Sequence, residues 1–376
     1  MFLFANNNFS MIMEGENMKG VVTNRQIFFI IFFILTGYSL VSIPKDAIKA
    51  AGTGAWVTIS ILTMLFAIAA FFIASLNKKF PGKTIFEYSS LLLGKPIGFV
   101  ISFIYSSNFL FVLVLICRGI AEFIKGSYLP LTPIWAILIL IIFVCLYISY
   151  KGITNLARLC EIYGAIFILT SLTIHFAQFF LGDIKYIQPF FEVSQIKKYI
   201  FGVKDLMPSF LGIEVLVVIP FGKVNNKKGI LYSIMGVVYV GLFYIIVVEG
   251  STMIAGINDI LNYNNSLIEA LRETRLPRVF LIERVDIIFD TIGIMGILAG
   301  LSVLFFAATE NATKLTRVNK RSLFLSVGIF TFIISNFFMD GELASLLLSN
   351  VVPICGIFTA FIIPITLFLI AKVKKL

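Results

Sequence analysis

The sequence predicts an all-α integral membrane protein with about ten transmembrane helices. These helices are expected to form two inverted five-helix repeats, in which the first and sixth helices are broken. Three observations predict this class. Hydrophobic residues fill 59% of the 376 positions, and the mean hydropathy is +1.00. Apolar runs of about 20 residues, the length that crosses a bilayer as a helix, recur along the chain. Two of these runs share one pattern of glycine and Ile-Pro.

The composition also excludes other classes of protein. A soluble domain cannot hide so much apolar surface, because its exterior must meet water. The net charge of +10 is spread between apolar runs, so we expect contact with a lipid bilayer and no nucleic acid partner. The sequence lacks a nucleotide-binding loop, a nucleophile triad and a metal-ligand cluster. We therefore expect no enzyme activity, no cofactor and no metal.

Ten segments qualify as spans. Most are bounded by charged or turn-forming connections, and the eighth is the least apolar because acidic residues recur at its start. In chain order, the expected spans are 26–50, 54–77, 96–124, 133–150, 159–181, 203–222, 229–255, 280–309, 322–339 and 349–371. Together they form one permease-like domain, 19–376, with a first repeat over about 26–181 and a second over about 203–371.

The connections predict the orientation and two further features. More than half of the basic residues lie in the segments that face the cytoplasm if both termini are inside, which favours an N-in, C-in topology. The charged linker 78–96 is expected to carry a short interfacial helix on that side. The outer connections around 181–202 and 257–278 would form a lid, a docking surface or plain loops. Residues 1–18 lack the basic start and apolar core of a signal peptide. We treat them as an uncertain leader, with translation from Met18 as the alternative to translation from Met1.

The first and sixth spans carry similar interruptions. The first reads LTGYSLVSIP from Leu35, and the sixth reads LGIEVLVVIP from Leu211. Glycine weakens a helix and proline removes a backbone donor. Unwound backbone is tolerated within a membrane only where it lines a cavity or is buried in protein. Because the two spans would cross in opposite directions, an inverted repeat with a small-ligand cavity at its centre is predicted.

Glu214 is the ionisable residue in the second interruption. We expect it to face the cavity, since ionisable residues at membrane depth are usually functional. The alternative is a Gly-Pro kink that serves only helix packing, with Glu214 hydrogen-bonded to a neighbouring helix.

Further polar residues lie in two other spans. Tyr105, Ser106 and Asn108 form a polar patch in the third span, where they would line the same cavity or pack helices. Asp286 and Asp290, with Glu283, fall along one face of the eighth span. That stripe would bind a cation, conduct protons or pair with nearby arginines.

Several segments together resemble the endospore germination permease family, the B subunits of nutrient germinant receptors within the amino acid–polyamine–organocation superfamily. The segments are TNRQIFFIIFFILTGYSLVSIP (23–44), GTGAW (52–56), NKKFPGKTIFEYSSLLLGKPIG (77–98), MPSFLGIE (207–214) and FLIERVDIIFDTIGI (280–294). One departure is GTGAW, where the family more often has an acidic residue before its Ala-Trp.

The resemblance implies a leucine-transporter type of fold and a function in spore germination. The chain would sense an amino acid or similar nutrient in the spore inner membrane, together with an A subunit and a lipoprotein C subunit. The family's ligand pocket corresponds here to Thr36, Gly37, Tyr38, Ser39, Ser209, Phe210, Leu211, Gly212 and Glu214. Two alternatives stay open: a proton- or sodium-coupled amino acid transporter, using Glu214 or the aspartate stripe, and a channel-forming component.

Overall fold

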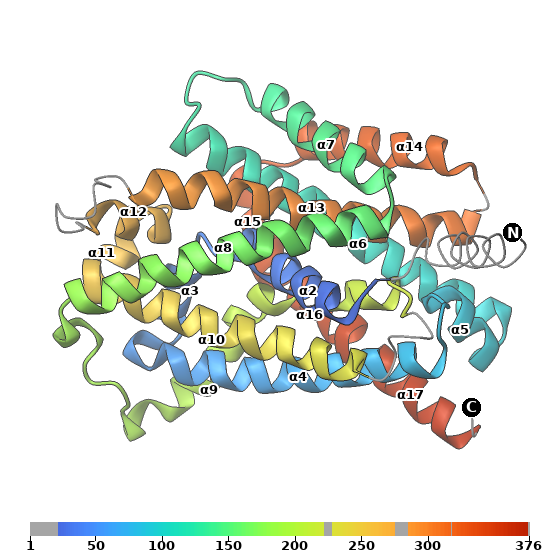
Figure 1. The fold of residues 1–376 in the computed structure, drawn as a ribbon, viewed down its shortest axis with the longest axis horizontal. Coiled ribbons are helices and arrows are strands. Elements are labelled where there is room, and N and C mark those ends of the chain that lie inside the picture. Colours follow the sequence, from blue (N-terminus) through green and yellow to red (C-terminus); the bar gives the residue numbers. More distant parts are fainter. Residues whose placement is uncertain (1–21, 222–227, 275–284, 317, 375–376) are drawn as a thin grey trace, which may run out of the picture.

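A computed structural model describes residues 22–221, 228–274, 285–316 and 318–374 of the chain. The described residues form a bundle of long helices that lie roughly side by side (Figure 1). The expected leader, 1–18, lies outside them. The helices are α2 (Asn24–Ser39), α3 (Ile43–Ala51), α4 (Ala55–Lys79), α5 (Ile85–Leu93), α6 (Lys95–Ser127), α7 (Ile134–Tyr150), α8 (Ile153–Leu181), α9 (Ile196–Leu206), α10 (Gly229–Ala255), α11 (Ile257–Asn262), α12 (Ser266–Glu273), α13 (Val285–Thr316), α14 (Lys320–Ile333), α15 (Gly341–Asn350), α16 (Val352–Gly356) and α17 (Ile363–Val373).

The described helices account for the expected number of crossings. Seven helical segments are long and apolar enough to cross a bilayer, and the shorter helices Asn24–Gly37 and Ile134–Tyr150 are also apolar. The broken sixth segment completes the ten. Many large apolar side chains on the outer surface are exposed, such as Leu140, Phe143 and Phe180. This surface suits contact with lipid, because large apolar patches are unfavourable in water.

The first span is broken where its two halves meet. Thr23 starts α2 with a capping box, in which its hydroxyl and the Gln26 side chain each accept a backbone N–H of the other residue. The helix ends at Ser39, and Pro44 lies in the first turn of α3. The break is therefore at 40–42. It lies between the predicted Gly37 and Pro44 and not at the glycine itself.

The sixth span departs further from a regular helix. The prediction was one broken helix over 203–222, but α9 ends at Leu206 and is followed by two 3₁₀ turns, Met207–Phe210 and Ile213–Val217. Leu211 is extended, and Gly212 adopts a φ of +121°. The segment from Met207 to Val217 is buried apart from one half-buried proline and one half-buried glycine, so protein covers its irregular backbone.

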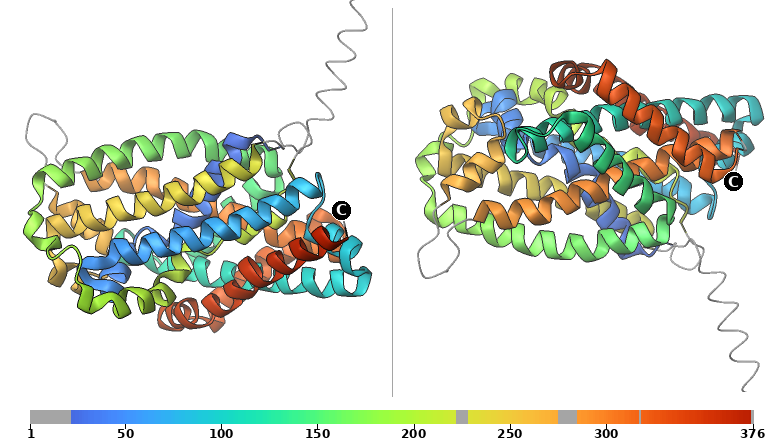
Figure 2. Two further views of the ribbon diagram at one scale, coloured as in Figure 1. Left: turned by 90° about the horizontal axis from the view of Figure 1, so that it is seen from below. Right: turned by 90° about the horizontal axis from the view of Figure 1, so that it is seen from above.

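The last two spans also differ from the prediction. The ninth ends in a π-helical turn, Ile334–Phe338, after α14. The tenth was expected as one helix over 349–371, but it begins at Gly341 and comprises α15, α16, a π-helical turn and α17. Pro353 falls in the first turn of α16 and explains one interruption, because proline cannot continue a preceding helix. The C-terminal helices pack along α4 and α6 at one side of the bundle (Figure 2).

The interfacial helix expected within 78–96 is α5. Thr84 and Glu87 form its capping box, and Glu87 also pairs with Lys314 near the end of α13, at 3.1 Å. Partial burial raises the pKa of the Glu87 carboxyl. The hydrogen bond from the Thr84 N–H and the Lys314 ammonium outweigh burial, so the net pKa is lowered. This pair links the α5 linker to the eighth span.

Helix α2 occupies the centre of the bundle, between α8, α10 and α13 (Figure 1). Its apolar residues from Ile30 to Phe33 are almost completely buried. A helix that is apolar on all sides belongs in a protein interior. The first broken segment is therefore enclosed by other helices.

Candidate functional site

The two broken segments lie side by side and run in opposite directions. Val22, at the start of the first, pairs with Phe221, at the end of the second, in an isolated β-bridge. At the opposite end, α3 packs against α9, and a Cβ on Gly202 would lie 3.0 Å from the carbonyl oxygen of Ala50. The start of each segment is thus beside the end of the other. This is the relation that an inverted repeat predicts.

The segments touch closely at their centres. Gly212 has the positive φ that glycine tolerates best. A Cβ at this position would lie only 2.9 Å from Ile34 Cγ1 and 3.2 Å from the Ile34 carbonyl oxygen of α2. Both the backbone conformation and the close approach therefore require a glycine here.

Tyr244 of α10 joins the two segments. Its hydroxyl lies 2.7 Å from the carbonyl oxygen of Leu35 and 3.1 Å from that of Ser209. The Tyr244 hydroxyl is therefore within hydrogen-bonding distance of a carbonyl oxygen in each broken segment. The Phe210 ring packs edge-on against Tyr244, with ring centroids 5.5 Å apart. It also packs, in a tilted arrangement, against Phe66 of α4.

Glu214 lies in this contact region with 3% of its surface exposed. Its Oε2 accepts the Gly212 N–H at 2.9 Å, and its Oε1 lies 3.5 Å from Asn108 Nδ2 of α6. Among the described residues, no cationic side chain pairs with it. Burying an unpaired carboxylate is costly. Its charge would therefore be neutralised by a proton or a bound cation.

The polar side chains predicted in the third span make buried hydrogen bonds to other helices. Asn311 of α13 exchanges hydrogen bonds with Ser102 and donates to Ser106. Tyr105 donates to the carbonyl oxygen of Thr359 in the last span. The Asn108 Oδ1 atom is buried and lacks a hydrogen-bond partner in the described part of the chain. The network couples α6 to α13, and Asn108 extends it toward Glu214.

A small cavity lies beside the first break. Its space for water-sized molecules is about 30 Å³, which is room for roughly one or two waters. The wall is formed by Phe33, Thr36, Gly37, Leu40, Val41, Phe123, Phe167, Ile268, Phe289, Asp290, Gly293, Ile294, Gly296 and Ile297. The cavity is largely apolar, and in this conformation it is too small for an amino acid.

The described part of the predicted outer segment, residues 257–274, covers this cavity through α12. Ile268 contributes to the wall, and the Leu267 N–H donates to the Val41 carbonyl oxygen at 3.2 Å. Lys45 reaches the same outer segment, since its backbone N–H donates to Ser266 and its ammonium to the Tyr263 carbonyl oxygen. The outer segment is thus attached to the first break by several hydrogen bonds.

The structure distributes the predicted site residues over two neighbouring regions. Thr36, Gly37 and Asp290 line the small cavity. Ser209, Phe210, Leu211, Gly212 and Glu214 form the central contact and are absent from that wall. Ser39 is half-buried, and its carbonyl oxygen accepts the Ser42 hydroxyl. Tyr38 belongs to α2 and Asp286 to α13, but their side chains, like the whole of Glu283, lie outside the described part.

Sequence reasoning missed Tyr244 and Asn311, and it offered a lid as only one of three roles for the connection that contains α12. A tyrosine in the apolar run GLFYII is a weak signal, since a buried hydroxyl usually seeks a partner. Asn311 lies in a polar stretch near the end of the eighth span. No pattern in the sequence indicates that α12 would lie over the first break.

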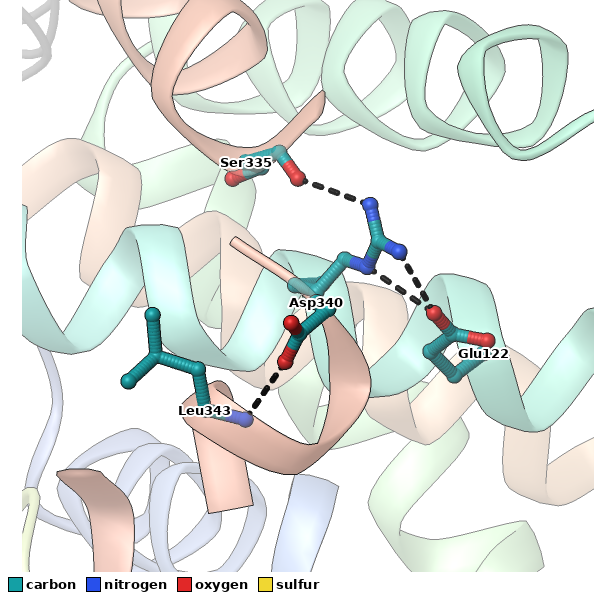
Figure 3. Close-up of polar contacts among 5 residues, drawn as sticks. Glu122, Ser335, Asp340 and Leu343 are labelled. Carbon is teal, nitrogen blue, oxygen red and sulfur yellow. Dashed lines mark hydrogen bonds and ion pairs between the residues drawn. The ribbon is translucent and has the colours of Figure 1, made fainter. Parts of the chain in front are cut away.

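A charged group links α6 to the ninth span (Figure 3). Arg118 contacts Glu122 one turn later, as their spacing suggests, with Nη2 2.7 Å from Oε1. Its Nη1 also donates to the Ser335 carbonyl oxygen at 3.1 Å. Ser335 lies in the π-helical turn that ends the ninth span. Nearby, Asp340 caps α15 by accepting the Leu343 N–H (Figure 3).

Comparison with solved structures supports the fold. The chain is similar to a Na⁺-coupled sialic acid symporter in its substrate-bound, outward-open state, with a TM-score of 0.64 and 13% identity over 91% of this chain and 79% of that one. It is also similar to Mhp1, a nucleobase-cation-symport-1 family transporter, with a TM-score of 0.60 and 11% identity over 90% and 77% of the two chains. The fold is therefore that of the leucine-transporter type, as expected.

Sequence comparison identifies the family. The spore germination protein YndE of Bacillus subtilis (strain 168) is 23% identical over 94% of this chain and 97% of its own length. Spore germination protein A2 of the same organism is 23% identical over 91% and 93%. A family profile described as "Spore germination protein" matches residues 21–342. With its apolar helices and transporter fold, the chain belongs to this family of integral membrane, permease-like spore germination proteins.

Proposed function

We propose that this chain is the membrane subunit of a spore germinant receptor and that it senses a small nutrient, most simply an amino acid. The observation that carries the proposal is the joining of both broken segments by Tyr244. A ligand that alters one segment would then act on the other. Family membership supplies the germination context.

The nutrient would bind at the first break. Leu40 and Val41 of the break line the small cavity, and the Val41 carbonyl oxygen would become available to a ligand when its hydrogen bond from the Leu267 N–H opens. Because the cavity holds only about 30 Å³, binding requires a more open state. Movement of α12 away from Val41 would provide access, so we assign the described part of the outer segment, residues 257–274, the role of a lid.

The switching energetics follow from the two states. A nutrient shifts the receptor only by the difference between its affinities for the open and closed states. A change from 1:99 to 99:1 needs about 5.5 kcal/mol of differential binding. The closed cavity provides a physical source for such a difference, since it excludes the ligand.

The proposed context includes partner proteins and a membrane. The chain would lie in the spore inner membrane with both termini facing the cytoplasm, and would act with an A subunit and a lipoprotein C subunit. The similarity to Bacillus subtilis spore germination proteins A2, B2 and KB supports a place in such a receptor.

The test is germination of spores that lack this chain. Dipicolinate release is followed over a panel of amino acids, with the intact chain restored as the control. Selective loss for one or a few nutrients, recovered on restoration, is the expected result. Restored and deleted spores that respond alike to every nutrient would argue against the sensor.

A second function has specific support. Both similar solved structures are of transporters, one of them Na⁺-coupled, and Glu214 is buried without a cationic partner among the described residues. A proton- or sodium-coupled amino acid transporter would use Glu214 as the coupling group. Uptake of labelled amino acid by proteoliposomes, dependent on an ion gradient, would favour this function over the sensor.

A further inference from the structure

A second and much larger cavity is lined in part by Gly82 and Thr84, which directly precede α5. Helix α5 lies at one end of the bundle (Figure 1). The space for water-sized molecules in this cavity is about 860 Å³, which is within the size range of small-ligand sites. The connection between α7 and α8, the end of α13 and the start of α14 surround it. Val218 and Pro220, at the end of the sixth span, complete the wall. This is the face that the basic connections predict to be cytoplasmic.

Positive charge dominates the wall of this cavity. Four of its side chains are cationic, and one is a carboxylate. The cations are Lys151, Arg158, Lys314 and Lys320, and the carboxylate is Glu310. A cleft lined by one sign of charge concentrates ions of the opposite sign.

Carboxylates only partly neutralise these cations. Lys314 pairs with Glu87 at 3.1 Å, and Lys320 lies 3.7 Å from Glu310. In the described part of the chain, neither Lys151 nor Arg158 has a carboxylate within ion-pairing distance. The Lys151 ammonium lies 5.1 Å from the centre of the Tyr147 ring. This cation–π contact leaves the positive charge of Lys151 in place. These two cations are therefore available to an anion.

The start of α8 adds to the positive potential. Gly152, with a φ of +91°, precedes the helix, and no side chain caps the first turn. The first turn contains no acidic residue. The positive end of the α8 dipole therefore adds to the positive potential of Lys151 and Arg158 in the same wall.

We propose that this cavity binds a phosphate-bearing anion, with Lys151 and Arg158 as its main contacts. A guanidinium binds phosphate through two parallel hydrogen bonds, and an ammonium adds a mobile point charge. Either a free phosphate or the phosphate of an anionic lipid headgroup provides this chemistry. The bound anion would lie between the start of α8 and the end of the sixth span. The inference does not depend on the nutrient-sensing proposal.

The test uses the full chain, purified and placed in phosphatidylcholine nanodiscs. Equilibrium binding of radiolabelled inorganic phosphate is measured for the parent, for Lys151→Gln, for Arg158→Gln and for the double variant. Lys95→Gln is the matched control, because Lys95 is an exposed cation at the same end but outside the cavity. Ionic strength is held constant with chloride.

We expect saturable phosphate binding that weakens at least tenfold in the double variant and less than twofold in Lys95→Gln. A second arm places the chain in nanodiscs with phosphatidylglycerol and counts retained lipids by native mass spectrometry. Two results together would identify the lipid headgroup as the source. The double variant would retain fewer lipids than the parent, and the parent would bind phosphate more weakly in these nanodiscs than in phosphatidylcholine nanodiscs. The proposal is overturned if neither probe binds, or if the double variant and Lys95→Gln bind both probes equally well.

Discussion

The Tyr244 hydroxyl lies 2.7 Å from the carbonyl oxygen of Leu35, so a helix of the second repeat is bonded to the first broken segment. The same hydroxyl is 3.1 Å from the Ser209 carbonyl oxygen in the sixth span. Because all three groups are buried, water cannot replace a missing hydrogen bond at this point. Tyr244 therefore connects the segments that form the proposed sensor.

Tyr244→Phe tests this connection. Leaving a buried carbonyl oxygen unsatisfied costs about 1–3 kcal/mol, so we expect a lower melting temperature and a weaker germination response. Tyr239→Phe is the matched control on the same helix, since the Tyr239 hydroxyl is buried without a partner in the described part of the chain. Thermal unfolding in detergent and dose–response curves provide the two measurements. Equal effects of both substitutions would show that the Tyr244 hydrogen bonds are unimportant.

Much of the bundle could be predicted from the sequence because continuous apolar runs define long spans. The predicted 229–255 agrees with α10, and the ends of α4 and α6 differ from the prediction by three residues or fewer. The split of the last span was missed, because Pro353 and a π-helical turn interrupt a run whose hydropathy stays high.

The local details of the site were less predictable. Gly37 lies inside α2 and not at the break. A Cβ at this position would face the glycine backbone of α13 at ordinary contact distances. Three residues, Leu40 to Ser42, form the break instead. The contacts of Tyr244 and of α12 depend on tertiary packing between distant segments, and a single sequence contains no direct record of them.

Glu214→Gln removes the ionisable group but keeps the size and shape of the side chain. Glutamine keeps an oxygen that accepts the Gly212 N–H, so we expect near-normal amounts of the protein in the membrane. Loss of the ionisable group should weaken the response to nutrient or change which nutrient is preferred. Dipicolinate release over a nutrient titration measures this, with Glu342→Gln as the control, because Glu342 is an exposed carboxylate outside both the site and the lid. A Glu214→Gln curve that overlays the parent curve would mean that the carboxylate is purely structural.

Gly212→Ala tests the close approach between the broken segments. A Cβ would be strained at φ +121° and would press on Ile34, so we expect destabilisation of more than about 1–2 kcal/mol. Gly82→Ala shares the positive φ, but a Cβ there meets nothing within 4 Å. Because φ is +121° at Gly212 and +76° at Gly82, a lower melting temperature of Gly212→Ala reports the contact with Ile34 together with the greater backbone strain. If Gly82→Ala is equally destabilising, that contact contributes nothing.

The Glu87–Lys314 pair makes a pH-dependent contribution. The folded-state pKa of Glu87 is lowered, since the Thr84 N–H and Lys314 outweigh the effect of burial. A lowered folded pKa stabilises the protein above the unfolded carboxyl pKa of about 4.3. This stabilisation disappears as the pH falls through the folded value. We therefore expect the parent to melt above Glu87→Gln at pH 7, with the difference vanishing toward pH 3. A difference that stays constant over this range would contradict the linkage.

The most direct measurement of the sensor proposal compares two substitutions at Gly37. Spores with only Gly37→Ala or Gly37→Val are tested for dipicolinate release with the nutrient to which deletion spores have lost their response. A Cβ at Gly37 would lie 3.7 Å from the Gly300 Cα atom, so alanine fits. The two methyl groups of valine would press on the α13 backbone where Gly37 and Gly296 line the small cavity, and would change the shape of its wall. We predict a normal curve for Gly37→Ala. For Gly37→Val we predict at least a tenfold higher nutrient requirement, with normal protein amounts. A Gly37→Val curve that matches the parent would contradict binding at the first break.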